Sequence, residues 1–280
     1  MQNFPPPRSS IGHGLSPLIM IPLLEPLFQG EMRSYGESLS CAPQFPPAAL
    51  PVAQLLSEPE LLTRQLHSSA AKFGLQDLRP VASDWSNRYL GALLPPLVAG
   101  ATLLRHRFPA SAGEMAVTLA PHGAVVGFHI LTLGESLPEA DTGQRYDALL
   151  RSHLAPLFAQ LSCQSGLAQK ILWGNAVRWL NFLFDAAQRL AAAHGEQHVA
   201  AVASDRAQLF DGALWTGEEN PLCMRRRCAP AKPGEKADAD GLIALHSQCC
   251  LYHLLPGQSY CGACPLDPLR VRGKALIAAG

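Results

Sequence analysis

The sequence is poor in charged residues and contains no phosphate-binding glycine motif. Only 16% of its 280 residues are charged, and 22 Lys and Arg balance 22 Asp and Glu. A basic excess would indicate binding to nucleic acid or to an anionic membrane, and this chain has none. No Gly-rich loop precedes a strand–helix unit, and no metalloprotease or serine-hydrolase motif is present. A built-in nicotinamide or flavin site is therefore not indicated.

Long uninterrupted apolar runs are also missing. The two most apolar stretches, 15–28 and 90–104, contain prolines and stay below the roughly 20 residues that a membrane-spanning helix needs. The first stretch is a poor signal peptide, because only Arg8 precedes it and no small-residue cleavage site follows. We expect both stretches to be buried in a cytoplasmic protein. A peripheral position at the inner face of the membrane stays open.

Apolar residues make up 48% of the chain, which is enough for a large buried core. Apolar residues at helical spacing predict helices over 57–70, 83–94, 97–106, 144–161, 167–172, 173–194 and 203–209. We expect Pro95-Pro96 to break or kink the helical run there. Within residues 115–133, two mainly apolar runs stand on either side of the turn Pro121-His-Gly123 and predict a β-hairpin. The predicted fold class is α+β: a mainly helical body with a small antiparallel β element and a loop-rich C-terminal cysteine region.

Cysteine is scarce over most of the chain and concentrated near its end. Six of the eight cysteines follow residue 222, and the full set is Cys41, Cys163, Cys223, Cys228, Cys249, Cys250, Cys261 and Cys264. A disulfide framework usually spreads its cysteines through a small extracellular domain. The clustering instead indicates a metal site in a reducing compartment.

The last four cysteines, in the pattern Cys249-Cys250-x10-Cys261-x2-Cys264, are the candidate ligands. A [2Fe–2S] cluster takes two thiolates on each iron, so four cysteines satisfy its ligand count. Gly262 would permit a tight turn between the last two ligands. Pro256-Gly257 predicts a turn that folds the spacer back as a short hairpin. We therefore predict a [2Fe–2S] cluster on these four cysteines.

The adjacent pair Cys249-Cys250 weighs against zinc. Neighbours in a strand point to opposite faces, so both can serve one cluster only in a turn-like conformation. Structural zinc sites usually space their ligands two to four residues apart. Zinc, disulfides or free thiols remain the alternatives.

Other nearby residues leave the ligand set open. Cys223-x4-Cys228 has a spacing used by plant-type ferredoxins, although both cysteines are more simply ordinary thiols. For His246 and His253 we expect supporting or surface roles. Asn175 should form hydrogen bonds inside the body or line a substrate pocket, and Trp85 and Trp179 should lie in the core rather than form a platform for a substrate.

Several motifs together resemble the FhuF family of ferric siderophore reductases, over roughly residues 50–270. Besides the four-cysteine pattern they are Trp85-Ser-Asn-Arg-Tyr, Leu93-Leu-Pro-Pro-Leu-Val, His153-Leu-Ala-Pro, Leu172-Trp-Gly-Asn-Ala176 and Asn220-Pro-Leu222. The resemblance implies that Cys249, Cys250, Cys261 and Cys264 hold a [2Fe–2S] cluster, which reduces iron bound to hydroxamate-type siderophores in the cytoplasm. Cys223 and Cys228 are departures from the family pattern.

The expected function is therefore reduction of Fe(III) to Fe(II) in a ferric siderophore. The alternative is a non-catalytic iron-chelate-binding protein with a structural zinc at the same cysteines. The electron should come from a separate donor protein or a reduced flavin. The basic run Arg225, Arg226 and Arg227 would steer an anionic chelate or an acidic donor, although such a run is more often a solvated face.

We expect three parts along the chain. Residues 1–47 are a proline-rich irregular N-terminal arm. Residues 48–216 form the mainly helical body, which resembles the siderophore reductases. Residues 217–280 are the C-terminal segment that binds the cluster.

Overall fold

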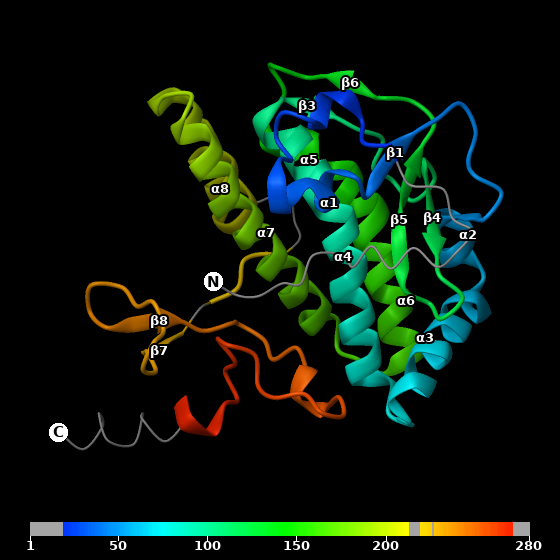
Figure 1. The fold of residues 1–280 in the computed structure, drawn as a ribbon, viewed down its shortest axis with the longest axis vertical. Helices are drawn as coiled ribbons and strands as arrows, with labels where there is room; N and C mark the ends of the chain where they lie inside the picture. Colours follow the sequence, from blue (N-terminus) through cyan, green and yellow to red (C-terminus); the bar gives the residue numbers. More distant parts are fainter. Residues whose placement is uncertain (1–18, 213–218, 226, 271–280) are drawn as a thin grey trace.

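The computed structural model of the chain describes residues 19–212, 219–225 and 227–270. Helices dominate these ranges, as predicted (Figure 1). The α-helices are α1 (Arg33–Gly36), α2 (Val52–Ser57), α3 (Pro59–Phe73), α4 (Leu78–Leu103), α5 (Thr142–Leu149), α6 (Ala155–Ser165), α7 (Gln169–Ala192) and α8 (Glu196–Asp211). Short 3-10 turns are η1 (Pro22–Leu24), η2 (Gly30–Met32) and η4 (Tyr252–Leu254), and the π-helical turn is η3 (Leu150–Leu154).

Strands are short and form small sheets. They are β1 (Leu39–Cys41), β2 (Ala49–Pro51), β3 (His106–Arg107), β4 (Met115–Leu119), β5 (Val125–Ile130), β6 (Glu135–Ser136), β7 (Cys228–Pro230) and β8 (Leu242–Ala244). One sheet has the order β1-β5-β4-β2, and β3–β6 and β7–β8 form pairs. The α+β prediction is confirmed.

The predicted hairpin is the centre of the four-stranded sheet. β4 and β5 pair antiparallel, and β1 is added parallel to β5. Gly123 adopts a left-handed φ of 80° in the turn, as a hairpin of this kind requires. Its carbonyl accepts a hydrogen bond of 2.9 Å from the Trp85 indole, which ties the turn to α4.

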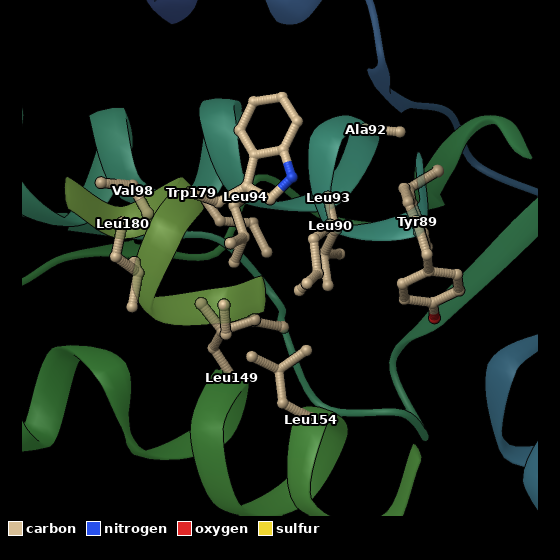
Figure 2. Close-up of a cluster of buried hydrophobic side chains, with 14 of the residues drawn as sticks. Tyr89, Leu90, Ala92, Leu93, Leu94, Val98, Leu149, Leu154, Trp179 and Leu180 are labelled. Carbon is tan, nitrogen blue, oxygen red and sulfur yellow. The ribbon is translucent and has the colours of Figure 1, made fainter. Parts of the chain in front are cut away.

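The packing of α4 against α7 forms the middle of the core. Gly91 lets the two helices approach closely, because a Cβ at this position would lie 2.7 Å from the Trp179 ring. Side chains from α4, α7 and the α5–α6 segment meet here, and Figure 2 labels Leu90, Leu94, Leu149, Leu154 and Leu180 among them. Trp85 and Trp179 are both buried, which confirms their predicted place in the core.

Of the predicted break or kink at Pro95-Pro96, the break is wrong, because α4 runs through both prolines. Proline lacks the N–H that would bond to the carbonyl four residues earlier, so Pro96 leaves the carbonyl of Ala92 free. The Ser38 hydroxyl donates to that carbonyl over 2.6 Å. Because α4 is buried on nearly every face, tertiary packing outweighs the poor helix propensity of proline.

Other helix predictions hold with shifted ends. The predicted 144–161 helix contains η3, and the predicted 167–172 and 173–194 segments are one helix, α7. Most of the predicted apolar stripe of α7 is buried, but Leu190 at its end is exposed. The helix predicted over 203–209 extends to 196–211 as α8.

From residue 19 on, the predicted irregular N-terminal arm contains the short helical turns η1, η2 and α1 and the strand β1, and part of it belongs to the core. Met20, Leu24 and Phe28 are buried, and β1 joins the sheet. From 219 onward the described chain is rich in loops, as expected. The division into three parts stays a prediction. None of the helices within the described ranges is both long enough and apolar enough to cross a bilayer.

We predict that Gly91→Ala lowers the free energy of unfolding by about 2 kcal/mol, because overpacking against the rigid Trp179 ring outweighs the gain in helix propensity. Thermal or denaturant unfolding measures this. Gly113→Ala is the control, since a Cβ at Gly113 meets nothing within 4 Å. Equal stability of the two variants would contradict the close approach of α4 and α7.

Candidate metal centre

The four C-terminal cysteines lie together in the structure. The sulfurs of Cys250 and Cys261 are 3.9 Å apart. Cys264 contacts both Cys249 and Cys261 through its thiol. The four thiols are therefore connected in the order Cys250, Cys261, Cys264, Cys249.

The chain turns sharply after Cys249 and Cys250, as it must if both sulfurs are to bind the same cluster. Leu251 has a left-handed φ of 59°, which is rare for a residue other than glycine. Its N–H points back to the Cys249 sulfur at 3.4 Å. The predicted turn-like conformation of the Cys249-Cys250 pair is confirmed.

The spacer between the two cysteine pairs folds back on itself. Gly257 has a φ of 71°, and Gln258 donates to the Leu255 carbonyl over 3.1 Å, so the predicted turn at Pro256-Gly257 is present. The ring of His253 stacks on Tyr260 with centroids 4.5 Å apart. The described spacer contains η4 and this turn, rather than the strands of a hairpin.

The turn at Cys261-Gly-Ala-Cys264 is closed by the Cys264 N–H, which donates to the Cys261 carbonyl over 3.0 Å. The expected conformational need for Gly262 is wrong: its φ is not positive, and a Cβ there would meet nothing within 4 Å. Its carbonyl instead accepts a hydrogen bond from Arg270, which also pairs with Glu235. The turn is thus held to the loop between β7 and β8.

Helices α4 and α7 of the body hold the chain at the adjacent residues Cys249 and Cys250. The Ser83 hydroxyl donates to the Cys250 carbonyl over 2.7 Å. Gly174 lies against Gln248, the residue just before Cys249, since a Cβ at Gly174 would lie 2.9 Å from the Gln248 Cβ. Figure 1 shows the C-terminal segment, in orange and red, at the end of the body where α4 and α7 begin.

Asn175 joins the two helices beneath the cysteines. Its amide donates to Ser83 Oγ over 3.1 Å and to Ser86 Oγ over 2.9 Å. Its Oδ1 accepts from the Arg178 guanidinium over 3.1 Å. Asn175 is fully buried, so the prediction of hydrogen bonds within the body is confirmed.

The thiols form a coupled hydrogen-bonded set. Hydrogen bonding from Cys261, with help from the positive charge of Arg178, lowers the pKa of Cys250 to about 5. Hydrogen bonds from Cys249 and Cys261 lower the pKa of Cys264. The pKa values of Cys249 and Cys261 are raised by those same partners and by burial. Cys250 and Cys264 are therefore favoured as thiolates, the form that binds metals, while Cys249 and Cys261 act as their thiol donors.

The remaining predicted residues lie outside this group of thiols. Arg225 and Arg227 are exposed, and Arg226 lies outside the described residues. Cys223 and Cys228 are exposed free thiols, so their role as alternative ligands stays untested. Cys249 Sγ is 3.8 Å from the Nδ1 atom of His253.

The donors fit a two-iron cluster in number and chemistry. All four cysteines are free thiols, and three of them are buried. In the described part of the chain, the side chains as placed form no group of three or more His, Cys, Asp or Glu that could hold a metal ion, so the fit is one of ligand number and residue type. The buried Nε of Arg178 has no hydrogen-bond partner and would meet an anionic cluster favourably.

The sequence-based reasoning did not single out Ser83, Gly174 and Arg178 as parts of the site. Gly174 directly precedes Asn175, and Arg178 lies three residues, about one helical turn, beyond it on α7. That spacing puts Asn175 and Arg178 on one face of α7. The spacing of Asn175 and Arg178 is visible in the sequence, but the sequence does not show that α4 and the cysteine segment pack against that face.

Four neighbouring thiols in a loop against a body of packed helices fit an iron–sulfur protein. Residues 83–232 match the family model of the ferric iron reductase FhuF-like transporter, and residues 249–266 match the FhuF 2Fe-2S C-terminal domain. The first match alone covers more than half of the chain. The chain belongs to the FhuF family, and the predicted resemblance and [2Fe–2S] cofactor are confirmed.

A curated relative is the ferric siderophore reductase of Escherichia coli (strain K12), which is 24% identical over 193 residues, 69% of this chain and 68% of the relative. A solved structure, ATP-bound aerobactin synthetase IucA of Klebsiella pneumoniae, aligns with a TM-score of 0.46 and 16% identity. The alignment covers 62% of this chain and 36% of the synthetase.

We predict that Gly174→Ala loosens the cysteine segment, because the added methyl collides with Gln248. The variant should bind less iron per chain and have an iron–sulfur absorption band of lower intensity. The second-site change Gln248→Gly removes the colliding Cβ and should restore most of the loss, as a double-mutant cycle. If the single variant binds iron like the unchanged protein, Gly174 does not position the site.

Proposed function

We propose that this protein is a ferric siderophore reductase that holds its [2Fe–2S] cluster on Cys249, Cys250, Cys261 and Cys264. The observation that carries the proposal is the gathering of these four thiols against the ends of α4 and α7. The match to the FhuF 2Fe-2S C-terminal domain covers the same cysteines. The curated relative named for reduction of ferric siderophores supports the substrate class.

The proposed reaction is a one-electron reduction. Siderophore oxygens are hard anionic ligands that hold Fe(III) more tightly than Fe(II), so one added electron weakens the complex. When bound, the cluster supplies that electron. The protein residues bind the cluster through their thiolates, keep Cys249, Cys250 and Cys264 from water, and leave Cys261 partly exposed. No proton transfer is needed.

The surface around the cysteines suits a bulky ligand. Exposed large side chains of this segment are Tyr252, Leu254, Tyr260, Leu266 and Leu269. Exposed apolar groups that gather on one surface are typical of ligand and partner sites. We propose that a hydroxamate-type ferric siderophore approaches here.

The proposed electron donor is a separate protein or a reduced flavin, and the proposed place of action is the cytoplasm. A donor is needed because the sequence lacks a nicotinamide or flavin motif. Sustained reduction of a ferric chelate by the purified protein with NADPH alone would refute a separate donor.

The ligand assignment is tested by changing each of Cys249, Cys250, Cys261 and Cys264 to Ser. We expect each variant to lose most of its iron and acid-labile sulfide, and to lose or alter the electron paramagnetic resonance signal of the reduced cluster, because serine replaces a thiolate ligand. Cys163→Ser is the control and should match the unchanged protein. A normal signal in all four variants refutes the assignment.

The same measurements separate the proposal from the zinc alternative. A red-brown protein with acid-labile sulfide supports a [2Fe–2S] reductase. A colourless protein with stoichiometric zinc refutes it and favours a binding protein with a structural metal.

We predict that neutralising Arg225, Arg226 and Arg227 to Gln slows reduction of an anionic ferric chelate several-fold at low salt, because positive surface charge speeds encounter with anions. The rate should also depend less on salt concentration. The control changes Arg33, Arg64 and Arg79 to Gln, which gives the same net charge. If the rate and its salt dependence match this control, steering by the basic run is wrong.

A further inference from the structure

Arg178 is a buried charge that lacks a counter-ion in the protein. It is 7% exposed. Its guanidinium bonds to the neutral amide of Asn175, and its Nε has no partner. Across residues 19–212, 219–225 and 227–270, no carboxylate forms an ion pair with it. A buried cation is strongly unfavourable unless something compensates it.

The neighbouring cations on the cysteine segment are compensated. Arg270 pairs with Glu235, and Lys232 pairs with Asp267. Arg178 differs because its positive charge acts on the sulfurs of Cys250 and Cys261. The anionic groups that balance the charge of Arg178 are therefore the cysteine thiolates.

Arg178 is also fixed in place. Asn175, which accepts its hydrogen bond, is anchored on α4 through Ser83 and Ser86. Ser83 holds the Cys250 carbonyl at 2.7 Å. One hydrogen-bonded network thus orients both the guanidinium and the cysteine that it faces.

We propose that Arg178 is a positioning residue that raises the reduction potential of the cluster. The inference rests on the proposed function, since it requires a cluster on these cysteines. One electron enters from the donor and one leaves to the ferric chelate, which becomes Fe(II); no proton or group moves. Uptake of an electron adds negative charge beside Arg178, and its positive charge stabilises that state. The potential in turn decides which donors and which chelates can react.

The test is a redox titration of the cluster, followed by absorption and electron paramagnetic resonance, in Arg178→Gln and Arg178→Lys. Arg178→Gln should shift the equilibrium at least tenfold towards the oxidised state, which is about 59 mV for one electron. Arg178→Lys keeps the charge and should stay closer to the unchanged protein. Arg88→Gln removes an exposed guanidinium of α4 and should have no effect. Asn175→Asp, which places a carboxylate against Arg178, should lower the potential as Arg178→Gln does.

The outcomes separate this inference from the proposed function. If the unchanged protein holds no iron and sulfide, the proposed function fails. If it holds a cluster and Arg178→Gln or Asn175→Asp has an unchanged potential, the inference about Arg178 is wrong. If neither variant assembles a cluster, Arg178 serves assembly rather than potential, and the inference is again overturned.

Discussion

The site depends on the hydrogen bonds that join α4 to α7 beneath the cysteines. Asn175 of α7 donates to Ser83 and Ser86 of α4, and Ser83 donates to the Cys250 carbonyl. Buried polar groups need partners, and a satisfied network fixes the geometry of everything attached to it. The loop has little regular structure of its own. Its shape near Cys250 therefore comes from the two helices.

Close packing lets α4, α7 and the loop that carries Cys249 and Cys250 approach one another closely enough to form these hydrogen bonds. Gly91 lets α4 approach Trp179 of α7, and Gly174 lets the chain before Cys249 approach α7. A protein interior is packed too tightly to absorb an added methyl group without movement. The core and the metal site thus share one pair of helices, and packing in the body is coupled to the placement of the thiols.

Much of the fold was predictable from local patterns. Apolar spacing identified most helices, and the glycine-containing turn between two apolar runs identified the hairpin. Continuity of α4 was not predictable, because Pro95-Pro96 locally opposes a helix, and only burial and the Ser38 hydroxyl compensate for it. The need for Gly262 was also misjudged, since the turn there does not use a left-handed residue. Local propensity fails where distant contacts supply the energy.

Within the site, the short stretch from Cys249 to Cys264 is enough to predict a cluster. Ligand number and spacing are local properties of the chain, and thiolate chemistry follows from residue type. The role of Arg178 is different, because it lies far from the cysteines in the sequence and its partners are found only by packing α7 against α4 and the loop. A charge acts through distance and burial rather than through sequence order. The sequence by itself thus determines the four cysteine ligands, whereas only the tertiary structure decides which charge acts on them.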